Sequence, residues 1–123
     1  MKLIDIIEKV KNSRPDATEE FITDTVNSLE AKLIKEIFEP AGIECEKRDI
    51  NSKADSNTLL LLDTDYSDLY LYYILAVIYA MDMDSEGYNN FMTLYNAVFE
   101  RFCIYFRKNN RPKSSVHIGG SNI

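Results

Sequence analysis

The chain has 123 residues, of which 46% are hydrophobic and 28% charged, and its formal net charge is −6. This length predicts one domain, because domains commonly hold about 100–150 residues. The acidic balance disfavours nucleic-acid binding by the body of the protein. Its two cysteines, Cys45 and Cys103, offer neither a disulfide framework nor a paired-cysteine metal motif. With no signal peptide in the sequence, synthesis in a reducing cytoplasm is the expectation.

Charge is distributed unevenly along the chain. Residues 1–100 contain 20 acidic and nine basic residues, a net charge of −11, and no acid follows Glu100. The basic residues after that point are Arg101, Arg107, Lys108, Arg111 and Lys113. An acidic body with a basic end can pair head to tail with copies of itself or dock on an acidic partner. The simpler alternative is that cations are favoured at the C-terminus of a helix.

Two amphipathic helices are predicted before residue 40. The first covers residues 3–13, with one apolar face formed by Leu3, Ile4, Ile6, Ile7 and Val10. It ends before Pro15, because a proline disfavours the helical conformation of the residue before it. Asp16 or Thr18 is the expected N-cap of the second helix, with Glu19 and Glu20 in its first turn. An apolar stripe then follows over about five turns: Phe21, Ile22, Val26, Leu29, Leu33, Ile34, Ile37 and Phe38.

Pro40 and Gly42 end the second helix. Residues 39–57 are polar and charged, which predicts a long surface loop of unassigned role from Gly42 to Asn57. The short apolar run of residues 58–62 precedes turn residues and is interpreted as an extended segment.

Residues 69–81 form the most apolar stretch, thirteen consecutive apolar or aromatic residues. A helix that is apolar all round must be covered on every side. Since a bilayer requires about 20 such residues, this stretch is too short to span a membrane. It is therefore predicted to be the central helix of a four-helix, all-α domain, with Asp65 or Ser67 as its cap.

The last helix begins near Ser85 and ends before Pro112. Its apolar and aromatic positions are Tyr88, Phe91, Met92, Tyr95, Val98, Phe99, Phe102, Tyr105 and Phe106. The predicted organisation is a helical domain over residues 1–108 and a flexible basic tail over residues 109–123, which contains Pro112, two glycines and three serines.

No enzymatic site is predicted. The only histidine, His117, lies in the predicted tail, and there is no glycine-rich phosphate loop. Asp82, Asp84 and Glu86 lack the spacing of a calcium-binding loop and are interpreted as acids at a helix start. No cofactor or metal is therefore expected.

Several motifs, taken in order, resemble one known family. In the last helix they are Tyr88-Asn89-Asn90, Met92, Tyr95-Asn96-Ala97, Phe99, Phe102, Tyr105, Phe106 and Pro112-Lys113. Upstream, they are Tyr66 with Leu69-Tyr70-Leu71-Tyr72, and Val26-Asn27 with Leu29-Glu30 and Lys35-Glu36-Ile37. This pattern resembles the small head–tail connector proteins of tailed phages and prophages of Gram-positive bacteria.

The resemblance implies a structural adaptor that forms a homo-oligomeric ring below the portal, in the virion, without chemistry of its own. The implied partners are further copies of the chain, the portal protein and a tail-side adaptor or stopper, with DNA passing through the ring but not specifically bound. Candidate subunit-interface residues are Tyr88, Asn89, Asn90, Arg107, Lys108, Arg111 and Lys113. The alternative from another class is a small helical regulatory or partner-binding protein of a mobile element.

Overall fold

The computed structural model describes residues 1–45 and 57–109. These residues form four α-helices: α1 (Leu3–Ser13), α2 (Glu19–Leu33), α3 (Ser67–Met81) and α4 (Ser85–Asn109). A π-helical turn (Ile34–Phe38) extends α2, a 3-10 turn (Thr64–Tyr66) precedes α3, and the described ranges contain no strand. The predicted all-α, four-helix fold is confirmed. Most of the predicted loop and nearly all of the predicted tail lie outside the described residues.

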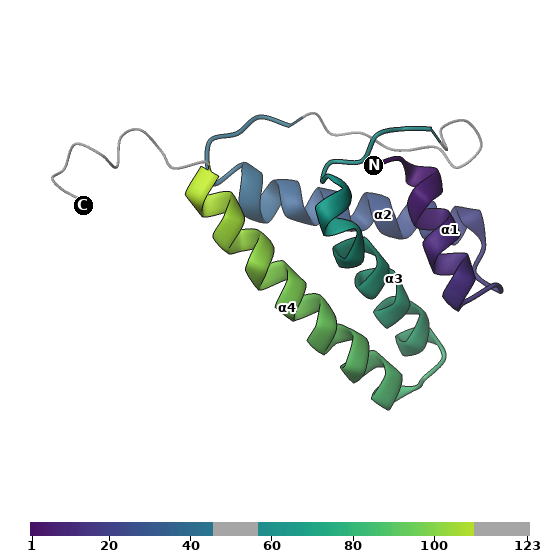
Figure 1. Cartoon of the computed structure of the whole chain (residues 1–123). Helices are drawn as coiled ribbons and strands as arrows, with labels where there is room; N and C mark the ends of the chain where they lie inside the picture. The colour runs from purple at the N-terminus through teal and green to yellow at the C-terminus, as the bar shows by residue number, and fades with distance from the viewer. Residues whose placement is uncertain (46–56, 110–123) are drawn as a thin grey trace, which may run out of the picture.

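The helices are arranged around a long hairpin made by α3 and α4. Figure 1 shows that α4 runs back along α3 from the turn between them, that α2 crosses behind this hairpin, and that α1 lies at the side of α3 away from α4. α3 contacts each of the other three helices.

The helix ends follow local capping chemistry. The hydroxyl of Thr18 accepts the backbone N–H of Phe21 at 3.1 Å, so Thr18 and not Asp16 is the N-cap of α2. For α3 the predicted caps were wrong: Asp63 accepts the backbone N–H of Asp65 at 3.0 Å and caps the preceding 3-10 turn. Through this 3-10 turn, the backbone N–H of Ser67 at the start of α3 donates to the carbonyl of Thr64.

The predicted extended segment pairs with the beginning of the chain. The backbone N–H of Leu3 donates to the carbonyl of Thr58, and that of Leu60 donates to the carbonyl of Met1, both at 2.9 Å. An isolated antiparallel bridge joins Lys2 to Leu59. The pairing fixes the segment that leads into α3 beside the N-terminus of α1.

The core lies where α1, α2 and α3 meet and continues along α4. Its fully buried side chains include Leu3, Ile6, Ile22, Leu29, Leu69, Tyr70 and Ile74. The prediction that α3 is covered on every side is not confirmed, because Leu71, Tyr72, Tyr73 and Val77 are only half-buried. Tyrosine tolerates this position, since its ring is apolar and its hydroxyl is polar.

Candidate functional site: the two ends of α4

The predicted interface residues fall into two separate groups on α4. Tyr88, Asn89 and Asn90 lie in its first turns, and Arg107 and Lys108 lie in its last turn. At 1.5 Å per residue the two groups are roughly 30 Å apart along the helix axis. The structure therefore does not bring them together within one chain. Arg111 and Lys113 lie outside the described residues.

The first group belongs to a surface at the α3–α4 turn, which we call the hairpin tip. The hairpin tip comprises Met81, Met83, Asp84, Glu86 and Tyr88. Asp84 accepts the backbone N–H of Gly87 at 3.0 Å and so caps the start of α4. This confirms the interpretation of Asp84 as an acid at a helix start.

Met83 is the most exposed large hydrophobic residue among the described residues. Its side chain is 91% exposed, and its backbone has a φ of +59°, a left-handed conformation that few residues other than glycine adopt. Met81 is 65% exposed beside it. A hollow of about 360 Å³ at the turn is lined by Ala80, Met83, Asp84, Ser85, Tyr88 and Asn89. Two of the predicted interface residues thus line this hollow.

The second group belongs to a surface that we call the basic end, which comprises Arg101, Ile104, Tyr105, Arg107 and Lys108. All five residues are exposed, and Ile104 and Tyr105 expose 45% and 49% of their area. The guanidinium of Arg107 donates from Nε to the carbonyl of Cys103 at 3.2 Å, which holds the side chain along the helix. None of the three basic residues forms an ion pair with another described residue.

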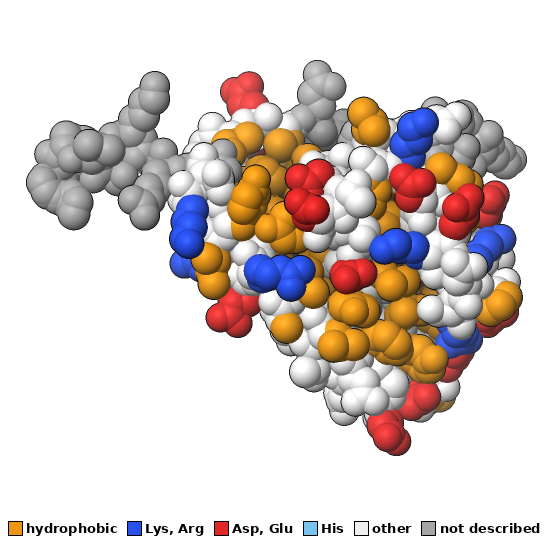
Figure 2. All heavy atoms as spheres, in the orientation of Figure 1, with side chains coloured by type: hydrophobic (Ala, Val, Ile, Leu, Met, Phe, Trp, Pro, Cys, Tyr) orange, Lys and Arg blue, Asp and Glu red, His pale blue; other side chains and the backbone are white. Residues whose placement is uncertain are grey.

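The space-filling view places these surfaces at opposite corners of the molecule. Figure 2 shows acidic side chains at the lower tip, where Figure 1 places the α3–α4 turn, and basic side chains at the left edge, near the last turns of α4. Hydrophobic side chains gather between them over the hairpin (Figure 2). The molecule therefore presents an acidic and a basic surface, each next to exposed apolar groups.

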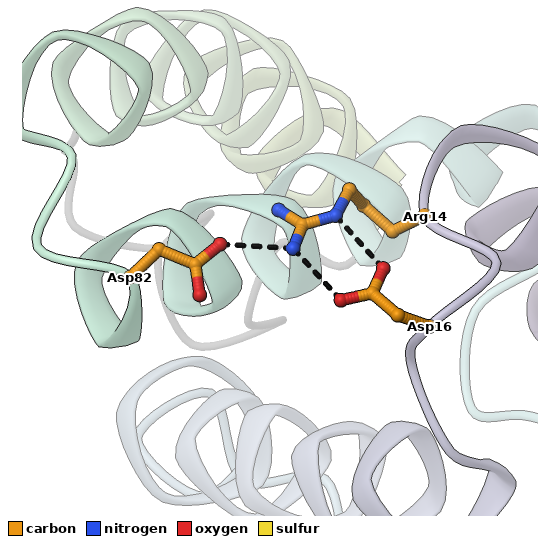
Figure 3. A network of polar contacts seen from close by, with 3 residues as sticks. All are labelled: Arg14, Asp16 and Asp82. Carbon is orange, nitrogen blue, oxygen red and sulfur yellow. Dashed lines mark hydrogen bonds and ion pairs between the residues drawn. The ribbon is translucent and has the colours of Figure 1, made fainter.

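A surface cluster around Arg14 anchors the hairpin to the loop between α1 and α2. Figure 3 shows its guanidinium between two carboxylates, with Nη2 at 2.9 Å from both Asp16 and Asp82 and Nε at 3.0 Å from Asp16. The same group lies 5.2 Å from the ring centroid of Tyr79. The hydrogen bond from Arg14 lowers the pKa of Asp16, and the bonds to Asp16 and then Asp82 raise the pKa of Arg14.

A second polar cluster is buried where α2, α3 and the extended segment meet. One carboxylate oxygen of Glu30, Oε2, accepts the hydroxyl of Tyr70 and the backbone N–H of Leu61, both at 2.7 Å. The hydroxyl of Tyr70 in turn accepts the backbone N–H of Leu62 at 3.1 Å. Glu30 is only 4% exposed. The cluster satisfies the backbone of the extended segment inside the core, which is a structural role.

The sequence reasoning missed both polar clusters. Glu30 lies four residues after Val26 and three before Leu33, so the acid faces the core within the apolar stripe of α2. That position was the available signal, because buried acids require hydrogen-bond partners. Arg14 offered no signal, since its partner Asp82 is 68 residues away.

Reactive groups are few among the residues that the structure describes. Burial raises the pKa of the Cys103 thiol, an effect that disfavours the nucleophilic thiolate. Within residues 1–45 and 57–109, no three histidine, cysteine, aspartate or glutamate side chains gather closely enough to bind a metal ion. No helix in these ranges has the length and apolarity needed to cross a bilayer.

Comparison with known proteins returned no match to a protein-family model, to a curated protein or to a solved structure.

Proposed function

We propose that this chain is a structural head–tail adaptor of a tailed phage or prophage, copies of which form a ring below the portal. The observation that carries the proposal is the presence of two chemically different exposed surfaces, the hairpin tip and the basic end, on one long helix. Exposed apolar groups beside charges without ion-pair partners are typical of protein-contact surfaces. The all-helical fold is the one that the motif resemblance implies.

In this proposal the work of the protein is geometric. A subunit with two different contact surfaces packs heterologously against its neighbours, and such contacts generate a ring when the rotation between subunits closes. The portal binds one face of the ring and a tail-side adaptor or stopper binds the other, at the head–tail interface of the virion. An acidic or neutral lumen reduces sticking of the DNA that passes through it.

The test is assembly on the portal protein encoded in the same genome region. The purified chain and portal are mixed and examined by gradient sedimentation and electron microscopy, with the portal alone as the control. We expect co-sedimentation and a ring of extra density on one face of the portal. A portal that remains unchanged in the presence of excess protein would contradict the proposal.

The basic end allows a sharper form of this test. We expect Arg107→Glu combined with Lys108→Glu to reduce ring assembly on the portal, because the reversed charges repel an acidic neighbour. The matched control is Lys32→Glu with Lys35→Glu, two exposed lysines on α2 and the π-helical turn. Equal assembly of the two double variants would remove the basic end from the interface.

A further inference from the structure

We infer that the hairpin tip of one copy docks on the basic end of α4 of the next copy. This inference rests on the proposed function and names the two surfaces through which its subunits would meet. The occupant of each surface is therefore a second copy of this chain. Two observations that are independent of each other lead to this pairing: the charges at the two ends of α4 and the apolar side chains beside them.

The acidic side chains of the hairpin tip have no cationic partner among the described residues. Arg14 engages Asp82, but Asp84 and Glu86 form no ion pair with another described residue. No lysine or arginine occurs anywhere between residues 54 and 100. The nearest cations in the sequence after the tip are those of the basic end, and these lie at the far end of α4. No described cation pairs with Asp84 or Glu86, and the basic end of a second copy supplies cations for them.

Helix-dipole preferences account for part of this pattern, since acids are favoured at helix N-termini and cations at C-termini. They do not account for the exposed apolar side chains at the same two places. Met81, Met83 and Tyr88 accompany the acids, and Ile104 and Tyr105 accompany the cations. Each surface thus combines an apolar centre with charges of one sign, and the two signs are opposite.

The conformation of Met83 strengthens the assignment. A glycine would adopt its positive φ without strain, yet the position carries a long, flexible apolar side chain that is almost fully exposed. Methionine adapts its shape to irregular partner surfaces. Ile104 and Tyr105 offer an aliphatic and an aromatic contact for it on the opposite surface.

The geometry of the pairing is head to tail. Because the two surfaces are different and lie at opposite ends of α4, each copy retains one free surface after binding one neighbour. Such a heterologous contact either closes into a ring or continues as a filament. The contact charges are exposed, so association should weaken as salt rises.

Cysteine cross-linking tests the pairing directly. In a cysteine-free background (Cys45→Ser and Cys103→Ser), Met83→Cys and Tyr105→Cys are made in separate proteins that are distinguishable by mass. Mixed and oxidised, alone and on the portal, they should form a hetero-disulfide several-fold above either homo-disulfide. Such a bond requires the two Cα atoms to approach within about 7 Å. Ser28→Cys, on the exposed face of α2, is the matched control.

Three cross-linking results would overturn the inference. They are a hetero-disulfide no more abundant than the Ser28→Cys background, predominance of a homo-disulfide, and cross-linking of Met83→Cys to the portal in place of a second copy. Circular dichroism of each variant establishes that it is folded before cross-linking.

Complementary variants provide a second test. Asp84→Asn with Glu86→Lys removes the negative charges of the hairpin tip and retains a side-chain oxygen that caps α4. Arg107→Glu with Lys108→Glu reverses the charge of the basic end. We expect neither to self-associate, but an equimolar mixture should form a dimer that does not grow. Met83→Gly keeps the backbone conformation and should weaken association by roughly tenfold. Self-association of either charge variant alone into assemblies of the wild-type size would overturn the inference.

The two proposals fail in different ways. If rings form on the portal and are unaffected by these variants, the adaptor proposal stands and the tip-to-end contact is wrong. If the hetero-disulfide forms but the portal is never decorated, the contact stands and the adaptor proposal is wrong.

Discussion

Tyr70 on α3 and Tyr95 on α4 are both buried, but their hydroxyl groups have opposite surroundings. The hydroxyl of Tyr70 donates to Glu30 and accepts from the backbone of Leu62. The hydroxyl of Tyr95 has no hydrogen-bond partner among the described residues. The ring of Tyr95 packs instead against those of Tyr73 and Phe99, with centroids at 5.4 and 5.8 Å.

The difference shows that two regions of the molecule are held by different forces. The junction of α2, α3 and the extended segment depends on directional hydrogen bonds in a buried site, which specify one arrangement. The α3–α4 hairpin depends mainly on apolar and aromatic packing, which is non-directional. A substitution in the hairpin should therefore lower the free energy of unfolding by removing packing contacts. A substitution at the junction should lower it by leaving buried polar groups without hydrogen bonds.

The largest effect is expected from Phe102→Ala in α4. Phe102 is buried, and its ring lies 5.1 Å from Tyr66, 5.9 Å from Phe106 and 6.4 Å from Phe38. Removing it leaves a cavity and should lower the free energy of unfolding by about 3–5 kcal/mol. Urea unfolding followed by circular dichroism measures the change. Leu94→Ala, an exposed site on the same helix, should change it by less than about 0.5 kcal/mol.

A loss for Phe102→Ala as small as that expected for Leu94→Ala would show that the packing of α4 around Phe102 contributes little to stability. The region would then have to be held by forces other than those that its ring contacts indicate.

The next largest effect is expected from Glu30→Ala at the junction. The substitution leaves the Leu61 N–H and the Tyr70 hydroxyl without their shared acceptor in a buried site. The free energy of unfolding should fall by about 2–4 kcal/mol. Glu30→Gln retains an acceptor oxygen and is the matched control, so its loss should be clearly smaller. If the alanine variant were as stable as the wild type, the cluster would contribute nothing to stability.

Tyr70→Phe isolates one arm of the same cluster. The ring remains, but Leu62 N–H loses its acceptor and Glu30 loses a donor. We expect a loss of about 1–3 kcal/mol, measured as a lower urea midpoint with an unchanged denaturant slope. Hydrogen exchange should also become faster at the Leu62 amide. An unaltered exchange rate there would argue against the bond.

The sequence predicted the helices well because their signals are local. Apolar periodicity located α1 and α2, and Thr18 was one of two proposed caps. Pro15 marked the end of α1, and Pro40 marked the end of the π-helical turn that extends α2. The cap of α3 was missed because Asp63, Asp65 and Ser67 are all chemically suitable, and only the intervening 3-10 turn selects Asp63.

The candidate surfaces were predicted only in part, since tertiary position decides which residues are exposed. Tyr88, Asn89, Arg107 and Lys108 were selected from charge and motif resemblance, but the exposure of Met83 was not foreseen. The apolar residues near Met83 in the sequence are equally compatible with a buried position. The partners of Glu30 and the contact of Arg14 with Asp82 could not be predicted for the same reason, because they join segments 31 to 68 residues apart.

The smallest effect in this comparison is expected from Tyr95→Phe. The substitution removes a buried hydroxyl that has no described partner, so stability should change by less than about 1 kcal/mol and is expected to rise. The contrast with Tyr70→Phe is the informative measurement, since both variants remove one oxygen from a buried tyrosine. A loss as large as that of Tyr70→Phe would show that the Tyr95 hydroxyl has a bonding partner.

The pH dependence of Tyr95→Phe provides the final comparison. Burial above all, and then neighbouring Tyr73, raises the pKa of Tyr95 to about 12 from its ordinary 10.0. Between these two pKa values the folded state keeps the Tyr95 proton and the unfolded state releases it. The free energy of unfolding therefore has its full value below pH 10.0 and decreases as the pH rises toward about 12. From about pH 9 to about pH 11, the urea midpoint should therefore decrease less in Tyr95→Phe than in the wild type. Some alkaline loss should remain, because burial also raises the pKa of Tyr66, and identical pH profiles would place the Tyr95 hydroxyl in contact with solvent.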